Sequence, residues 1–470
     1  MSAIAPALAP ALEARLVATA DERLARYLEL LRIPSISALS QHAPDCRRTA
    51  AWISAELTRI GFEHVEVQAG VERPVVYADW LHASGAPTVL VYCHYDVQPI
   101  DPIELWETAP FEPFVRDGRM IGRGSADDKG QIAMHLDAAE AFFATRGRLP
   151  LNLRIVFEGE EESSSVTLEQ WLPANRERLA ADAVVISDTG FFEGNHPALT
   201  MSLRGLAYMQ IDVVGSPIDL HSGGYGGMVE NPANALARII ASLKDADGVV
   251  QVPGFYDEVV ELTPAQRAAI AALPFDEAAY LARVGIRALA GEAGYTPLER
   301  KGARPTLDVN GLWGGFQGEG SKTIIPAHAH AKVSCRLVAD QDPQVIFERV
   351  RDHVLAIAPA GVTVEVRPLG FGRPTMTSED NPVAQAGLRA LRAAFGVEPL
   401  RIREGGSIPV AALFASILEV PVVLLGFANP DSNAHAPNES MVLDNYERGI
   451  RAICALWDDL GRSTAGGAGA

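Results

Sequence analysis

The chain has 470 residues, 48% of them hydrophobic and 21% charged, which is typical of a soluble globular protein long enough for two domains. Its 59 acidic and 40 basic residues give a formal net charge of −19, which argues against nucleic acid or an anionic membrane as a partner. No apolar run is long enough to predict a membrane span.

The cysteines and the N-terminal stretch indicate a compartment. Cys46, Cys93, Cys335 and Cys454 are far apart and form no C-x-x-C pair, so we expect reduced thiols. The stretch MSAIAPALAPALEARL has neither a basic region nor a long apolar core, unlike a secretory signal. These features predict a cytoplasmic protein.

The part of the chain before Arg204 alternates short apolar runs with helical patterns. The stretch DKGQIAMHLDAAEAFFATRG predicts a helix, because Ile132, Leu136 and Phe143 share one face and Gly147 can end it. Strands with little alternation, as in a sheet covered on both faces, are predicted at residues 74–80, 88–95, 151–157 and 183–187, and again at 422–427.

From about Arg204 the pattern changes. GLAYMQIDVVG and HAHAKVSCRLV alternate between apolar and polar residues, as half-buried antiparallel strands do. Asn231 is a typical helix N-cap and Pro232 suits the first turn of a helix, so a helix is predicted to begin here. After GFGRPTMTSEDNP the buried-strand pattern returns. We therefore expect an α/β domain at residues 1–203 and 374–470, interrupted by an inserted α+β domain at 204–373.

Polar residues follow the predicted buried strands, at the sheet edge where open α/β folds bind ligands. Singly, each has an ordinary structural explanation: a satisfied histidine, a solvated glutamate or a helix N-cap. The residues that follow strands or precede the helix are His94 and Asp96, Asp127 and Asp128, Glu160 to Glu162, Asp188 and His435.

Together these residues predict a metal centre. Two histidines and at least three carboxylates at one edge would repel each other strongly without a counter-charge. A pair of divalent ions removes that repulsion, and mixed histidine and carboxylate ligands suit zinc, manganese or cobalt.

The sequence resembles metallopeptidase family M20, which includes dipeptidases, carnosinases, glutamate carboxypeptidases and several deacylases. The resemblance extends from about residue 90 to 440, and DLHSGGYGG and REGGSIP are similar to the dipeptidase branch. It implies a mixed-sheet, phosphorylase/hydrolase-like α/β catalytic domain, with the inserted domain acting as a lid and dimerisation domain. The motifs that carry it are HYDVQP, GRGSADDKG, FEGEEESSS, VVISD, DLHSGGYGG, SKTIIP, SCRLV, REGGSIP and HAPNES.

The resemblance also implies roles at the sheet edge. Asp96 would orient the His94 ring, and Glu161 would be the general base, with Glu160 a bystander. The peptide bond between Asp127 and Asp128 would be cis. The implied ligands of two divalent ions, expected to be zinc with manganese or cobalt as alternatives, are His94 and Asp188 for one, Glu162 and His435 for the other, and Asp127 for both.

In the inserted domain, the resemblance implies contacts to substrate. His221 would stabilise the oxyanion from a partner subunit, which implies a homodimer through this domain. Arg336 would bind the substrate carboxylate. Further donors would be Thr323, Ser407 with the backbone of Gly405 and Gly406, and, as a further contact, Asn310.

The predicted function is therefore a two-metal dipeptidase acting on short peptides with a free C-terminal carboxylate. An N-acyl or N-carbamoyl amino-acid amidohydrolase with the same metals is an alternative. A non-catalytic peptide-binding protein is an alternative of another class, disfavoured because neither Glu161 nor any ligand is missing. A structural zinc protein is disfavoured because structural sites prefer closed, cysteine-rich ligand sets.

Overall fold

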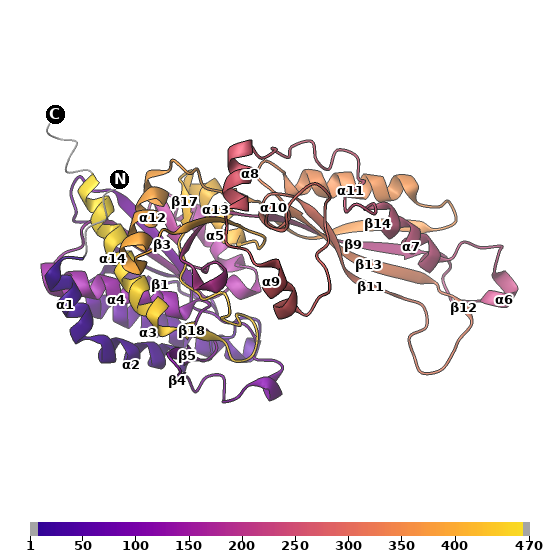
Figure 1. Cartoon of the computed structure of the whole chain (residues 1–470). Helices are drawn as coiled ribbons and strands as arrows, with labels where there is room; N and C mark the ends of the chain where they lie inside the picture. Colours follow the sequence, from indigo (N-terminus) through magenta and orange to yellow (C-terminus); the bar gives the residue numbers. More distant parts are fainter. Residues whose placement is uncertain (1–7, 464–470) are drawn as a thin grey trace. The chain divides into compact units, whose positions relative to one another are not determined.

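The computed structural model describes residues 8–463, which form two compact units (Figure 1). The large unit comprises the described residues up to Met201, the segment Thr377–Ile402 and the residues from Leu413 onward. The inserted unit comprises Ser202–Met376 and Arg403–Ala412. Each unit has its own hydrophobic core, as separate domains do.

A nine-stranded mixed sheet runs in the order β1-β2-β6-β3-β7-β17-β8-β15, with β16 beside β8. Its central strands β6, β3, β7 and β17 are parallel to one another, which confirms the predicted α/β class. The strands are β1 Glu63–Val67, β2 Val76–Trp80, β3 Thr88–His94, β6 Asn152–Glu158, β7 Ala183–Ile186, β8 Ala198–Leu203, β15 Thr375–Met376, β16 Leu400–Glu404 and β17 Val422–Leu424. A separate small sheet pairs β18 Ser440–Val442, β5 Arg119–Ile121 and β4 Phe114–Arg116.

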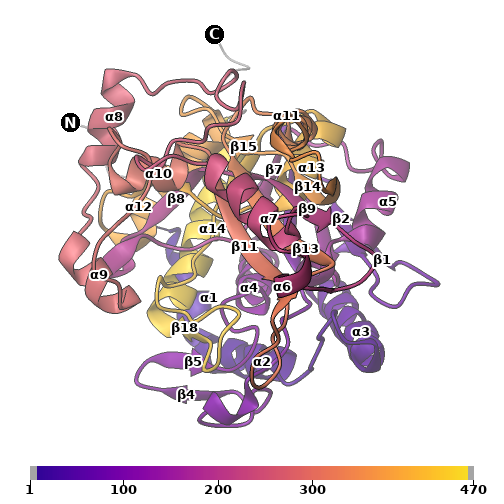
Figure 2. The ribbon, with the colours of Figure 1, turned by 90° about the vertical axis from the view of Figure 1, so that its right-hand side faces the viewer.

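The helices of the large unit cover this sheet, and α14 packs against both α4 and α12 (Figure 2). The predicted helix at 128–147 is α4, which Gly147 ends in the left-handed conformation, with its N–H bound to the Phe143 carbonyl. The helices are α1 Pro10–Ala18, α2 Ala20–Leu31, α3 Ala43–Ile60, α4 Lys129–Arg146, α5 Val166–Ala174, α12 Pro382–Phe395, α13 Pro409–Leu418, which begins in the inserted unit, and α14 Leu443–Ser463.

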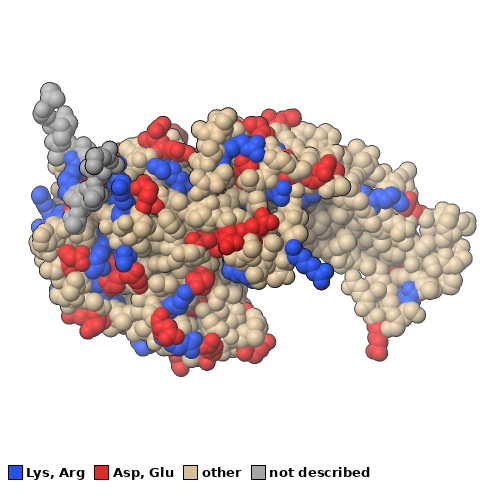
Figure 3. Space-filling model, in the orientation of Figure 1, with Lys and Arg blue, Asp and Glu red and all other residues tan. Residues whose placement is uncertain are grey.

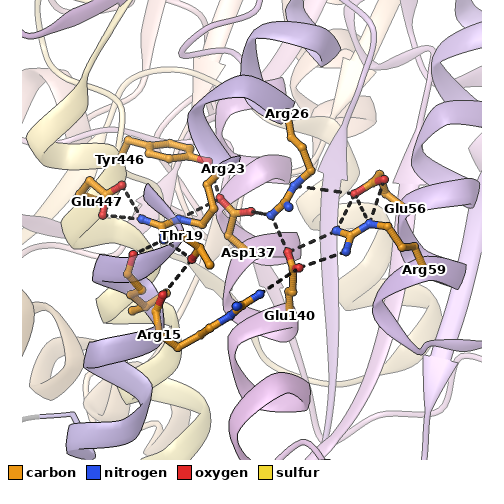
Figure 4. Close-up of polar contacts among 11 residues, drawn as sticks. Arg15, Thr19, Arg23, Arg26, Glu56, Arg59, Asp137, Glu140, Tyr446 and Glu447 are labelled. Carbon is orange, nitrogen blue, oxygen red and sulfur yellow. Dashed lines mark hydrogen bonds and ion pairs between the residues drawn. The ribbon is translucent and has the colours of Figure 1, made fainter. Parts of the chain in front are cut away.

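A network of arginines and carboxylates joins α2 to α4 and α14 (Figure 4). Arg23, which is 2% exposed, donates to both carboxylate oxygens of Glu447, at 2.5 and 2.7 Å. Asp137 accepts hydrogen bonds from Arg26 at 2.9 Å and from the Tyr446 hydroxyl at 2.5 Å. Burial raises the pKa of Asp137 to about 6. The network fixes α4, whose N-terminal end follows the loop that carries Asp127.

The inserted unit contains a four-stranded antiparallel sheet in the order β11-β13-β9-β14. The two stretches predicted to alternate are β9 and β13, and they pair along their whole length. Alternate residues of β9, from Ala207 to Val213, are buried under the helices α7 (Pro232–Ser242) and α11 (Pro343–Ile357). The strands are β9 Gly205–Val214, β10 Leu220–His221, β11 Thr306–Gly314, β12 Ile324–Ile325, β13 His328–Leu337 and β14 Thr363–Gly372.

The predicted helix start at Asn231 is confirmed in this unit. The Asn231 side chain accepts a hydrogen bond from the Ala233 N–H at 2.9 Å, and Pro232 is the first residue of α7. The helices of the inserted unit are α6 Ser222–Tyr225, α7 Pro232–Ser242, α8 Pro264–Ala271, α9 Glu277–Val284, α10 Pro297–Gly302 and α11 Pro343–Ile357.

Charge is dispersed over the face shown in Figure 3, where Lys and Arg side chains lie among Asp and Glu rather than in a continuous basic patch. Among residues 8–463, no helix is both long enough and apolar enough to cross a membrane.

Candidate metal centre

His94 is the last residue of β3, and its ring is buried at the carboxyl end of the sheet. Nδ1 lies 3.1 Å from the Asp96 carbonyl oxygen and 3.4 Å from Asp96 Oδ1. Nε2 lies 2.9 Å from Asp127 Oδ1 and 3.9 Å from Asp188 Oδ1. Asp188 follows β7, the strand that pairs with β3, so the sheet itself sets the distance between these two side chains.

Asp127 stands between the two histidines. Its Oδ1 faces His94, and its Oδ2 lies 2.9 Å from His435 Nε2. His435 Nε2 also lies 3.3 Å from Glu162 Oε2. The peptide bond between Asp127 and Asp128 is cis, as the resemblance implies. One carboxylate thus offers a different oxygen to each histidine.

The structure brings the expected ligands into two overlapping groups. Within each group the ligand atoms lie within 4.8 Å of one another, and both groups use Asp127. This is the arrangement of a two-metal site bridged by a shared carboxylate. The groups are His94, Asp127 and Asp188, and Asp127, Glu162 and His435.

The chemistry of the donors fits divalent cations. His94 Nε2 is buried and, although it lies 2.9 Å from Asp127 Oδ1, it makes no hydrogen bond of good geometry, as expected of an atom placed for coordination. Among the described residues, no lysine or arginine forms an ion pair with Asp127, Glu162 or Asp188. Burial raises the pKa of Asp188 to about 6, whereas hydrogen bonds to Asp127 and Glu162 raise the pKa of His435 to about 10. Lysine and arginine thus supply no counter-charge to these carboxylates, and the raised pKa of His435 reflects an excess of negative charge that two cations would balance.

Glu161 lies beside the cluster but belongs to neither group. It begins a short 3₁₀ turn, Glu161–Ser163, which follows β6, Gly159 and Glu160. The Asp96 carboxylate accepts the N–H groups of Glu161 at 3.1 Å and Glu162 at 3.0 Å, so it holds this turn. Burial raises the pKa of Glu161 well above its usual range. Glu160 instead accepts the Thr167 N–H at 2.8 Å, at the start of α5.

Three side chains at this site were not singled out from the sequence. Gln98 donates to Glu162 Oε2 at 2.6 Å. Glu439 and Arg123 form a buried ion pair at 2.9 Å under the loop that carries Asp127. Gln98, Arg123 and Glu439 lie in HYDVQP, GRGSADDKG and HAPNES, so membership in these motifs is the only sequence signal for them.

In the inserted unit, Arg336 and Ser407 are in contact. Arg336 Nη1 donates to Ser407 Oγ at 2.7 Å, and Ser407 Oγ donates to the Arg204 carbonyl at 2.5 Å. The Arg204 N–H donates to the Gly406 carbonyl at 3.0 Å, and Arg204 Nε donates to the Gly405 carbonyl at 3.1 Å. Arg204, which the sequence did not indicate, thus holds the 405–407 segment beside Arg336. Among the described residues, Arg336 forms no ion pair with a carboxylate, so its guanidinium is free to bind an anion.

His221 and Thr323 lie together at the β10–β12 pair, where His221 is opposite Ile324. His221 is exposed, and its Nδ1 accepts the Gly224 N–H at 3.1 Å. The Thr323 carbonyl accepts from both the N–H and the hydroxyl of Ser222 at 3.1 Å. Asn310 is exposed at a bulge in β11, between Val309 and Gly311.

Comparison with known proteins gives the family. Residues 90–459 match peptidase family M20/M25/M40. The chain is 33% identical to a Cys-Gly metallodipeptidase of Schizosaccharomyces pombe, over 94% of this chain and 96% of the relative. It is 30% identical to the human Beta-Ala-His dipeptidase, over 90% and 86% of the two chains. A solved M20 metallo-carboxypeptidase of Sulfolobus solfataricus superposes with a TM-score of 0.84 at 33% identity, over 94% of this chain and 99% of that one.

The protein belongs to peptidase family M20/M25/M40, which confirms the resemblance seen in the sequence. It is a metal-dependent peptide hydrolase whose large unit carries candidate ligands for two divalent ions.

Proposed function

We propose that this protein is a two-metal dipeptidase, which hydrolyses the peptide bond of short peptides that have a free C-terminal carboxylate. One observation carries the proposal: two ligand groups share Asp127, and Glu161 stands beside them without joining either. The relatives from fission yeast and human are named as dipeptidases, which supports the substrate class.

The residues of the large unit divide the chemistry. Bound by the two groups, divalent ions would lower the pKa of a water molecule and polarise the scissile carbonyl. Glu161 would accept the proton of that water and deliver it to the leaving amine. Asp96 would keep Glu161 in place through the main-chain hydrogen bonds described above. His94 would be oriented by the Asp96 carbonyl and carboxylate acting on its other ring nitrogen.

Zinc is the metal we propose, with manganese or cobalt as alternatives. The ligands are imidazole nitrogens and carboxylate oxygens, and neither group contains a thiolate. Such a set suits zinc in a catalytic rather than a structural site, and it also suits manganese and cobalt.

In the inserted unit, we propose that Arg336 binds the C-terminal carboxylate of the substrate, with the Gly406 backbone and Ser407 as further donors. To donate to substrate, the Ser407 hydroxyl would first release the Arg204 carbonyl. The free guanidinium face of Arg336 supports this assignment, since arginine binds carboxylates in a bidentate manner. Thr323 and Asn310 are proposed as further contacts. A clamp on the free carboxylate favours short peptides over internal bonds of proteins.

His221 is proposed to stabilise the oxyanion of the transition state, acting from the partner subunit of a homodimer. Its exposure on β10 suits a residue that acts outside its own fold. The inserted unit, residues 204–373 of the predicted division, would then serve as the lid and dimerisation domain. We also propose a cytoplasmic location, because all four cysteines are free and buried, as in a reducing compartment.

A substrate panel tests this function. Metal-free protein would be assayed on dipeptides, a tripeptide, and N-acetyl and N-carbamoyl amino acids, before and after Zn²⁺, Mn²⁺ or Co²⁺ is restored. We expect metal-dependent hydrolysis of dipeptides. Cleavage of only the acylated substrates would replace the substrate class, and tight peptide binding without turnover would favour a non-catalytic binding protein.

A further inference from the structure

Glu439 is fully buried, and its carboxylate is surrounded by donors from one loop. Oε1 accepts the N–H groups of Ala126 at 2.8 Å and Asp127 at 3.0 Å. Oε2 accepts the Gly124 N–H at 2.9 Å and Arg123 Nη1 at 2.9 Å. Charge-assisted bonds of this kind are roughly twice as strong as neutral ones.

The loop that donates these bonds is also held at other points. The Arg123 N–H donates to the Pro110 carbonyl at 2.9 Å, and the Ser125 carbonyl accepts from the Tyr27 hydroxyl at 2.5 Å. Residues 122–128 lie between β5 and α4, outside regular secondary structure, so their N–H groups need partners from elsewhere. Gly124 has a left-handed φ of +83°, and a Cβ there would lie 2.8 Å from Val97 Cγ1. The loop is therefore tightly packed, and one carboxylate binds three of its N–H groups.

Glu439 also lies in the same segment as the expected ligand His435, which precedes it by four residues. The Glu439 carbonyl accepts the Gly122 N–H at 2.9 Å, and the next residue begins β18, which pairs with β5. Backbone and side chain of one residue thus join the His435 segment to the Asp127 loop.

We propose that Glu439 is a positioning residue that sets the distance between Asp127 and His435, and so the affinity of the Asp127–Glu162–His435 group for its metal ion. This inference rests on the two-metal function proposed above. The other group depends less on Glu439, because the paired strands β3 and β7 hold His94 and Asp188. Loss of the Glu439 bonds would allow Asp127 and His435 to move apart, whereas His94 and Asp188 would stay in place.

The test is equilibrium binding of Co²⁺ to metal-free protein, followed by visible absorption and metal analysis. In Glu439→Gln, the amide NH₂ group would face either Gly124 and Arg123 or the Ala126 and Asp127 N–H groups, placing donor against donor. We expect the second Co²⁺ to bind ~10–100-fold more weakly than in the wild type, the usual effect of losing a residue that orients a ligand. The first Co²⁺ should lose much less affinity than the second, because His94 and Asp188 stay in place, and turnover should recover as the Co²⁺ concentration is raised.

A matched control is Glu299→Gln in the inserted unit. Glu299 is also a buried carboxylate that accepts from an arginine, Arg267, and from a backbone N–H, that of Thr296. Its loss should lower the unfolding temperature without changing either Co²⁺ affinity. His435→Ala serves as the reference for a lost second ion.

Unchanged Co²⁺ affinities in Glu439→Gln, with a lower unfolding temperature alone, would overturn the inference and leave Glu439 a stabilising residue. If Glu439→Gln does not fold, Arg123→Lys decides, since it removes one donor and keeps the charge; a weakened second Co²⁺ supports the inference and an unchanged one refutes it. Failure of the wild type to bind two Co²⁺ ions would instead count against the proposed function.

Discussion

Three consecutive glutamates have three different surroundings. The Glu160 carboxylate accepts the Thr167 N–H, and that of Glu162 lies beside His435 and Gln98. Glu161 takes part in neither ligand group. Removing its charge should lower kcat for a dipeptide by ~10²–10⁴-fold, the usual contribution of a general base.

The check is Glu161→Gln beside Glu160→Gln, with metal content and turnover measured on both. We expect Glu161→Gln to retain its ions and lose activity, whereas Glu160→Gln keeps nearly all of its activity. Equal losses in the two variants would mean that the base has been assigned to the wrong glutamate.

Substitution of Arg336 tests how a single residue recognises the substrate. Arg336→Met should raise KM for a dipeptide by ~10–100-fold, the cost of a lost hydrogen bond to a charged group. The KM for the corresponding dipeptide amide should hardly change, because that substrate has no C-terminal carboxylate. Arg349→Met, which removes an arginine paired with Glu258 in the same unit, is the control. A parallel rise for acid and amide would contradict the carboxylate role.

At the scale of elements, the junction between β6 and the turn at Glu161 depends on Gly159. A Cβ on Gly159 would lie 2.3 Å from the Tyr95 ring, whose hydroxyl donates to the Pro74 carbonyl at 2.5 Å. Gly159→Ala should therefore displace the turn, lower the free energy of unfolding by ~1–3 kcal/mol and reduce turnover.

The control is Gly387→Ala on α12, where a Cβ would make only an ordinary 3.6 Å contact with Leu199. Urea unfolding and dipeptide turnover would be measured on both variants. If Gly159→Ala were as stable and as active as Gly387→Ala, the turn would not be held by this packing.

The sequence predicted the elements that carry the site more fully than the contacts that hold it. Apolar runs without alternation located β3 and β7, and the polar residues that follow them identified His94 and Asp188, because parallel strands end at one sheet edge. Glu439 and Arg204 were missed, since each acts on a loop distant in the chain. A periodic sequence pattern cannot predict that the Glu439 carboxylate binds N–H groups more than three hundred positions away in the chain.

At the scale of the whole molecule, the role of His221 concerns the assembly. His221→Ala and Glu161→Gln should each be inactive alone. Mixed under conditions that exchange subunits, they should recover up to about a quarter of wild-type activity, since half of the dimers are mixed and each holds one complete site. Mixtures of Glu161→Gln with the wild type serve as the reference for the effect of subunit exchange on activity. No recovery, with mixed dimers shown to form, would mean that His221 acts within its own subunit.

The most direct test of the whole account is a metal titration of the metal-free protein, with bound ions and dipeptide turnover measured on the same samples. The account predicts two bound Zn²⁺, Mn²⁺ or Co²⁺ ions per chain and dipeptide hydrolysis that rises with their binding. Asp127→Asn, which alters the one carboxylate common to both groups, should impair the binding of both ions. Full activity with one ion or none, or two ions bound as tightly in Asp127→Asn, would contradict a shared two-metal centre.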